Sequence, residues 1–163
     1  MRNKQKGFSL IELLIVVAII LIIAAIAIPN LLRSRMAANE ASAVASCRTI
    51  NTANVVYSST YTVGFSPDMT SLSDGGTPAN CIPPAVPLAT QSCLIDASLA
   101  TGTKSGYKFT YAKTVVGTVN ATYSVSASPL SIGSTGQRGF FTDQTNVIRA
   151  NATGTATVAD PAI

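Results

Sequence analysis

The sequence contains no histidine and no tryptophan, and it has only three cysteines. Without histidine it can form no Ser–His–Asp triad and no histidine metal site, and three cysteines are too few for a four-cysteine zinc site. No glycine-rich phosphate loop is present, and the acidic side chains lack the spacing of a calcium loop. Beyond the N-terminus these isolated acids are Glu40, Asp68, Asp74, Asp96, Asp143 and Asp160. We therefore expect that the chain is not an enzyme and that it has no metal site and no cofactor.

Charge is also scarce, because charged residues make up 11% of the chain and hydrophobic residues 47%. The net charge is +4, but Arg2, Lys4 and Lys6 lie at the extreme N-terminus. Without them eight basic residues (11 − 3 = 8) face seven acidic ones. The eight are scattered and form no basic stripe among aromatic residues. We expect no direct binding of nucleic acid.

One long apolar run occupies residues 8–28, and Glu12 is its single ionisable residue. As a helix, 21 residues would extend about 31 Å, enough to cross a hydrocarbon layer of about 30 Å. The positive charges before it favour a cytoplasmic N-terminus, so that the rest of the chain is exported.

Two ordinary roles compete for this run. It could be a secretory signal cut near Ala25-Ile26-Ala27, although it is longer than the usual 7–15 apolar residues and contains a carboxylate. It could also be a permanent anchor, for which Glu12 is an unexplained cost. An acidic residue at a helix centre costs about 2.5–3.5 kcal/mol, and less near the end.

The residues Lys6-Gly7-Phe8-Ser9-Leu10-Ile11-Glu12, followed by the apolar run, resemble the processing signal of type IV pilins and pseudopilins. The resemblance implies cleavage between Gly7 and Phe8, N-methylation of Phe8, and a role for Glu12 in subunit assembly. An ordinary secretory signal is cut after its apolar run, whereas this motif places the cut before it.

The resemblance also implies partners and location. A prepilin peptidase and the pilus assembly machinery would act on a precursor in the inner membrane, and the product would be an extracellular homopolymer, a helical cell-surface filament. Such a filament serves adhesion, motility or DNA uptake. The alternative is a pseudopilin of a type II secretion system. The major pseudopilin typically has a calcium-binding acidic cluster near its C-terminus, where only Asp143 and Asp160 occur here.

Elementary electrostatics agrees with an assembly role for Glu12. Cleavage after Gly7 would create an α-amine with a reference pKa near 8, four residues before Glu12 on the same helix face. A neighbouring subunit could offer the same amine. At ~4 Å and an effective dielectric constant of ~20 the attraction is about 4 kcal/mol. Desolvation offsets part of it, so selection of register is the safer expectation.

Pro29 follows the apolar run directly. It lacks an N–H and crowds the preceding turn, which by itself indicates a helix end. The resemblance instead implies a kink at Pro29 with the helix continuing. Many members of the family have a glycine inside the apolar run, and this chain has none.

The expected fold is α+β and pilin-like, with a long N-terminal helix packed on a small C-terminal antiparallel sheet. We divide the chain into a cleaved leader (1–7), a transmembrane and filament-core helix (8–29) and an exported head (30–163). Within the head, helix 30–58 has an apolar stripe expected to face the sheet: Met36, Ala43, Cys47, Ile50 and Tyr57. Its charged residues are expected to be solvated or to contact other subunits: Arg33, Arg35, Glu40 and Arg48.

A loop is expected over residues 59–105, where glycine and proline are frequent. Cys81 and Cys93 lie in this loop with eleven residues between them, and export makes a disulfide plausible. It would contribute ~3 kcal/mol in the chain-entropy model. Cys47 would then be a buried thiol. Pairing of Cys47 with either loop cysteine stays an open alternative.

Alternating apolar and polar residues predict three or four antiparallel strands over residues 106–150. They include Tyr107, Phe109 and Tyr111, and later Tyr123 and Val125. Residues 151–163 are expected to form a weakly ordered tail. Two sequons make Asn120 and Asn151 possible glycosylation sites.

Overall fold

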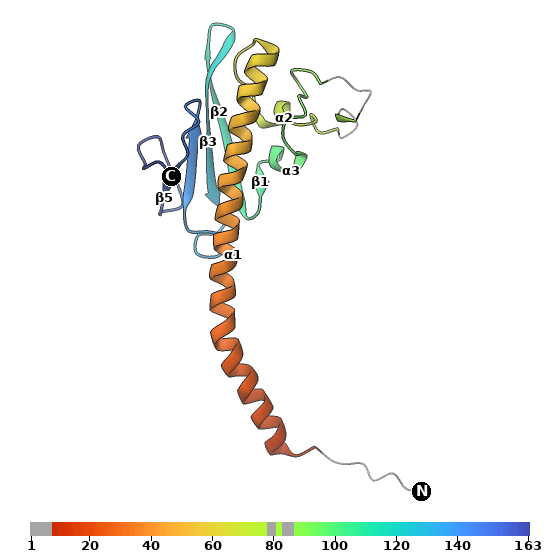
Figure 1. The fold of residues 1–163 in the computed structure, drawn as a ribbon, viewed down its shortest axis with the longest axis vertical. Helices are drawn as coiled ribbons and strands as arrows, with labels where there is room; N and C mark the ends of the chain where they lie inside the picture. Colours follow the sequence, from red (N-terminus) through yellow and green to blue (C-terminus); the bar gives the residue numbers. More distant parts are fainter. Residues whose placement is uncertain (1–7, 78–80, 83–86) are drawn as a thin grey trace. The chain divides into compact units, whose positions relative to one another are not determined.

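The computed structural model describes residues 8–77, 81–82 and 87–163 (Figure 1). The chain divides into two compact units, Met1–Arg35 and Met36–Ile163. Helix α1, Leu10–Tyr61, begins in the first unit and ends in the second. Each unit is described by itself.

Pro29 lies inside α1 and does not end it. The residues before it are leucine, isoleucine and alanine, which favour or tolerate a helix. The loss of one backbone hydrogen bond therefore does not stop the helix. A helix end at Pro29 is excluded, and a kink there stays a prediction.

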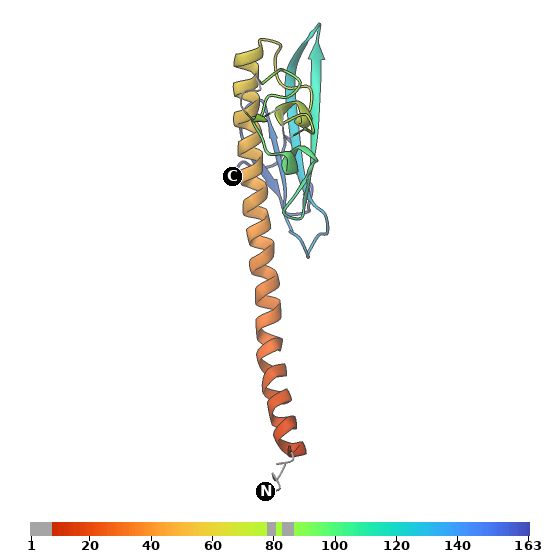
Figure 2. The ribbon, with the colours of Figure 1, turned by 90° about the vertical axis from the view of Figure 1, so that its right-hand side faces the viewer.

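The second unit contains a five-stranded antiparallel sheet in which neighbouring strands follow chain order, β1-β2-β3-β4-β5. The strands are β1 Thr103–Lys104, β2 Tyr107–Val116, β3 Val119–Pro129, β4 Gly139–Asp143 and β5 Arg149–Asn151. Residues 36–61 of α1 cover one face of this sheet, so the unit has two layers (Figure 2). The expected α+β fold is confirmed, and the two-residue β1 is an edge strand that the sequence did not predict.

The core lies between these two layers. Along β2 and β3 alternate side chains point to the helix, and Tyr107, Tyr123 and Val125 are fully buried. From α1 the core receives Cys47 and Ile50, with further residues on the same face: Ala43, Ala53 and Tyr57. The alternate side chains of the strands thus pack against the apolar stripe of the helix, as expected. Met36, the first residue of the predicted stripe, is only half-buried.

A polar layer is buried within the same interface. Asn51 of α1 donates to Thr142 Oγ1 (2.8 Å) and accepts from the Tyr123 hydroxyl (3.0 Å). One turn later, Asn54 Oδ1 accepts from the backbone N–H of Ser66 (3.1 Å) and from the Tyr111 hydroxyl (2.9 Å). Buried polar groups need such partners, so these bonds fix one position of the helix against the sheet.

Two short helices follow α1: α2 Met69–Leu72 and α3 Ala97–Ala100. Asp68 caps α2 by accepting from Ser71 N (2.7 Å), and Asp96 caps α3 by accepting from Leu99 N (2.8 Å). Aspartate is a favourable N-cap because its side chain satisfies an N–H that the helix leaves free. The expected loop therefore contains two capped turns of helix.

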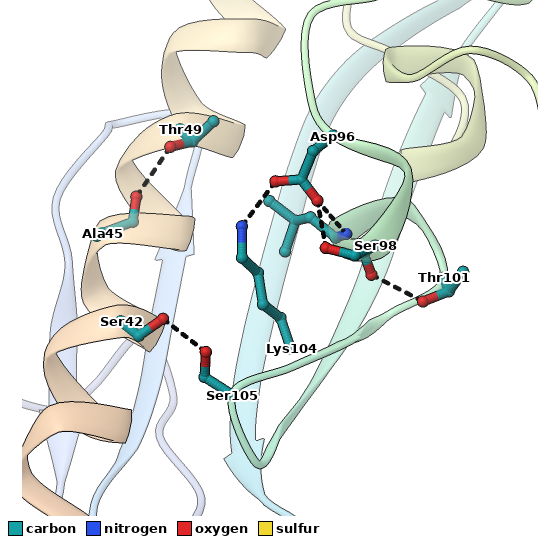
Figure 3. A network of polar contacts seen from close by, with 9 residues as sticks. Ser42, Ala45, Thr49, Asp96, Ser98, Thr101, Lys104 and Ser105 are labelled. Carbon is teal, nitrogen blue, oxygen red and sulfur yellow. Dashed lines mark hydrogen bonds and ion pairs between the residues drawn. The ribbon is translucent and has the colours of Figure 1, made fainter. Parts of the chain in front are cut away.

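Asp96 also holds the edge strand in place. Lys104 of β1 lies 2.6 Å from Asp96 Oδ2, and the Ser98 hydroxyl contacts Oδ1 (Figure 3). Chiefly through the Lys104 hydrogen bond, the pKa of Asp96 falls to about 2. Next to this group, Ser42 of α1 donates to Ser105 Oγ at 2.9 Å (Figure 3). These contacts connect the start of the sheet to α3 and to α1.

The C-terminal residues do not form the loose tail that composition indicated. Ala150 N donates to the carbonyl of Pro161 (3.1 Å), and Ile163 N donates to the carbonyl of Ile148 (2.9 Å). The Asp160 carboxylate accepts from Asn151 Nδ2 (2.6 Å). The last residues therefore pair with β5 and cover its outer edge, which an unpaired strand would leave open.

Candidate functional site

The predicted cleavage site lies at the start of α1. Phe8 is exposed, whereas Gly7 lies outside the described residues. The Ser9 carbonyl accepts from the N–H groups of Glu12 (3.1 Å) and Leu13 (3.2 Å), and the helix begins at Leu10, two residues after Phe8. A cut before Phe8 would thus leave the whole helix on the mature chain.

Glu12 belongs to the first turn of α1. In that position its negative charge interacts favourably with the helix dipole, an effect of about 0.3–1 kcal/mol. This local role explains an acidic residue in the first turn of a soluble helix. It is smaller than the cost of about 2.5–3.5 kcal/mol for an acidic residue at the centre of a membrane-spanning helix, a cost that falls toward the end of the helix.

The apolar residues of α1 up to Leu32 are exposed on all sides of the helix. An 18-residue window of α1 has a mean hydropathy of 3.3 and none of it is buried within the chain. By length and composition α1 can cross a membrane. An apolar surface this large and continuous marks a contact with lipid or with other protein chains. Its large side chains are Leu10, Ile11, Leu13, Leu14, Ile15, Val16, Val17, Ile19, Ile20, Leu21, Ile22, Ile23, Ile26 and Ile28.

Burial in α1 changes character at Glu40. Before this residue no described side chain of the helix is buried, and after it one face is buried at every turn. Arg33 and Arg35 lie just before this change and are exposed, in agreement with their predicted solvation. The helix therefore combines an apolar segment that is exposed in the described structure and an amphipathic segment that belongs to the head.

Glu40 itself corrects the sequence interpretation, which placed it in solvent or against another subunit. It is buried, and its carboxylate accepts from the backbone N–H groups of Gln137 (2.9 Å) and Arg138 (3.1 Å) and from Arg138 Nε (2.7 Å). Burial alone would raise the pKa of Glu40, but these hydrogen bonds and the charge of Arg138 outweigh it and lower the pKa. Glu40 therefore fastens the β3–β4 connection to α1.

The cysteines are arranged as the preferred prediction had them. A disulfide joins Cys81 to Cys93, whose Cα atoms are 5.7 Å apart. Cys47 is a free thiol that is fully buried on α1. Burial raises the pKa of this thiol to about 12, so it stays protonated and unreactive.

Both sequon asparagines use their amide groups within the fold. Asn120 Nδ2 donates to the Phe65 carbonyl (2.9 Å), and Asn151 Nδ2 donates to Asp160. Each asparagine is half-buried. A sugar on either nitrogen would have to form around these contacts, and glycosylation at these positions stays a prediction.

Among the described residues no group of three or more His, Cys, Asp or Glu side chains is placed to hold a metal ion. The apolar segment of α1 and the residues at its start are the candidate site.

Comparison with known proteins points to the same segment. Residues 2–28 match the family model of the prokaryotic N-terminal methylation motif. A relative in Thermus thermophilus, the type IV wide pilus major component PilA4, is 68% identical over 40 residues. This match covers 24% of the present chain and 30% of the relative, so less than a third of the relative's length is spanned. No solved structure matches the chain.

Proposed function

We propose that the whole chain is the structural subunit of an extracellular type IV pilus filament. Residues 2–28 match the prokaryotic N-terminal methylation motif, and 40 residues are 68% identical to a type IV pilus major component. The observation that carries this proposal is the apolar segment of α1, which follows the motif and is exposed along its length in the described part of the chain. A filament with a helical core would bury it.

Processing would prepare the chain for assembly. A prepilin peptidase would cut between Gly7 and Phe8 at the inner membrane and methylate Phe8, and the leader with its three positive charges would be lost. The new α-amine then lies close to Glu12 of the same or a neighbouring subunit. An uncut chain has no such amine, so cleavage would act as a precondition for polymerisation.

The apolar segment would serve twice, first as the membrane anchor of the precursor and then as the core of the filament. Full burial of each leucine, isoleucine or valine contributes about 1.5–3 kcal/mol, so the segment as a whole contributes some tens of kcal/mol in a helical bundle. Small residues allow helices to approach closely. In this segment they are Ala18, Ala24, Ala25 and Ala27.

The pilus assembly machinery of the inner membrane and further copies of the chain would be the partners, and adhesion, motility or DNA uptake the use of the filament. A pseudopilin role in type II secretion is not favoured, because the relative that the chain resembles is named as a pilus major component.

The mature N-terminus tests the proposal. Mass spectrometry of filaments sheared from cells should find a chain that begins at Phe8 and carries one added methyl group. A Gly7→Val variant should keep its leader and stay in the membrane, because its cleavage site is blocked. A secreted chain that begins at or after Ile28 would instead establish an ordinary secretory signal.

A further inference from the structure

The two ends of the β2–β3 hairpin are far apart in the head. Val116 pairs with Val119 beside the turn, and Tyr107 pairs with Pro129 at the other end. Each strand has ten or eleven residues, which at about 3.4 Å per residue separates the ends by roughly 30 Å. The hairpin runs alongside residues 36–61 of α1 (Figures 1 and 2), so its ends are separated along the helix direction within this unit.

At the turn end, apolar side chains are exposed together. We call Val63, Val115, Val116 and Val119 the tip patch; each is at least 40% exposed and Val116 reaches 66%. The backbone fixes their neighbourhood, because Phe65 N donates to the Asn120 carbonyl at 3.0 Å. No charged residue occurs from Thr114 to Thr122.

At the opposite end, a second apolar pair is exposed. Leu130 and Ile132 follow β3 and are 59% and 58% exposed; we call them the base patch. No charged residue occurs from Ser128 to Gln137. Neither patch therefore contains a charged residue.

The base patch stands on a rigid support. Leu130 N donates to the Gly106 carbonyl (2.9 Å), and Asn39 Nδ2 of α1 donates to the Thr135 carbonyl (2.8 Å). The Glu40 carboxylate holds the next two residues. The connection is therefore held by α1 and by the β1–β2 turn, while the side chains of Leu130 and Ile132 stay more than half exposed.

We propose that the tip patch of one subunit packs on the base patch of the next subunit along the filament. This inference rests on the proposed pilus function. Two different patches at opposite ends of one molecule form a heterologous contact, which builds an open polymer and not a closed dimer. If residues 36–61 of α1 lie along the filament axis, these ends face the axial neighbours. Because neither patch contains a charged residue, no like charges would oppose each other at the contact.

Cysteine cross-linking in assembled filaments tests the contact. The full-length Val116→Cys/Leu130→Cys variant is treated with a bismaleimide too short to join the two positions within one chain. The buried thiol of Cys47 does not compete, since its pKa is about 12. We expect a ladder of dimers, trimers and higher oligomers in denaturing gels.

Matched controls separate this contact from others. Val116→Cys alone should give no cross-link, and Val116→Cys/Thr110→Cys should give none either, because Thr110 is exposed in the middle of β2. Filaments that form normally but give no ladder would overturn the inference while leaving the pilus function intact. Dimers from Val116→Cys alone would also overturn it, since they would show a tip-to-tip contact.

Charge variants cover the case in which the cysteine variants do not assemble. Val116→Asp should lower the yield of sheared filaments about tenfold, because its carboxylate would be buried against Leu130 without a partner. Leu130→Lys should do the same, and the double variant should recover most of the yield by pairing the charges. If the double variant is no better than the single ones, while head stability is unchanged in all three, the proposed contact is wrong.

Discussion

Glu40 and Arg48 lie two helical turns apart on α1, yet their charges serve different purposes. The Glu40 carboxylate has three hydrogen-bond donors around it and is buried. Arg48 is exposed and forms no ion pair within the described part of the chain. Only the first of these charges can contribute substantially to stability, because exposed charges interact weakly through water.

Replacing Glu40 by glutamine tests this difference. At pH 7 we expect Glu40→Gln to lower the free energy of unfolding by about 1–2 kcal/mol, since an ionic acceptor is lost and Arg138 is partly screened by solvent. The measurement is chemical denaturation of the full chain in detergent, followed by circular dichroism. Arg48→Gln is the matched control and should change stability by less than about 0.5 kcal/mol.

The same pair of variants predicts a pH dependence. Folding lowers the pKa of Glu40 from its ordinary value of 4.5, so its stabilising effect is complete above that value and is lost as the pH falls through the lowered pKa. The difference between wild type and Glu40→Gln should therefore shrink below pH 4.5. A difference that is constant down to pH 2 would contradict a contribution from the ionised carboxylate.

Single residues also mark the limit of what the sequence predicted. The buried face of α1 was read from its apolar residues, and Cys47 and Ile50 lie where this pattern placed them. Asn51 and Asn54 lie on the same face and are buried too, but a polar side chain gives no sign of burial until its partners on other elements are known. Glu40 was missed for this reason as well.

At the scale of elements, the disulfide-bonded loop has one arm that is already fixed. Ser92, Cys93 and Leu94 donate their N–H groups to carbonyls of residues 71–73, at distances of 2.7–2.9 Å. The disulfide extends this support to Cys81, twelve residues earlier. Its main effect should be to restrict the unfolded chain and the segment between the two cysteines.

Removal of this bond should therefore act locally. We expect Cys81→Ser/Cys93→Ser to lower the free energy of unfolding by about 2–3 kcal/mol and to speed proteolysis between residues 75 and 90. The five-stranded sheet should survive, because its strands begin only at Thr103, after this loop. Limited proteolysis with mass spectrometry and thermal unfolding measure the two effects. Loss of all sheet signal would show that the loop is needed for the core to form.

Elements with a strong period were predictable, and those without one were not. Apolar and polar residues alternate clearly in strands β2 and β3, and α1 has a long apolar run followed by an apolar stripe. Each of these elements was therefore expected near its observed place. The two-residue β1 and the four-residue α2 and α3 are too short to have a period. The pairing of the C-terminal residues with β5 depends on backbone hydrogen bonds, which composition does not encode.

At the scale of the whole chain, one helix is apolar in two different ways. In the head segment, the apolar residues lie on one face, which is buried against the sheet. In the N-terminal segment, apolar side chains lie on all sides of the helix and are exposed in the described structure, so lipid or other chains would have to bury them. This asymmetry would suit the membrane-bound precursor and the filament that we propose. The sequence was sufficient to predict the apolar run, because a run of 21 residues needs no tertiary information.

Glu12 tests whether assembly depends on charge. If its carboxylate meets the α-amine of Phe8, Glu12→Gln should be inserted into the membrane as well as wild type, since a charge is removed from an apolar segment. It should nevertheless form few or no filaments, because the amine would lack its counter-charge. Glu12→Asp, the matched control, retains the charge on a shorter side chain and should restore part of the yield.

The size of the effect separates this pairing from a helix-capping role. Loss of a favourable interaction with the helix dipole costs at most about 1 kcal/mol, which would reduce filament yield several-fold. Loss of the counter-charge for a buried amine should abolish assembly. Surface filaments are counted by electron microscopy beside immunoblots of membrane and sheared fractions. Normal filament yield from Glu12→Gln would rule out charge pairing and leave apolar burial as the driving force of the polymer.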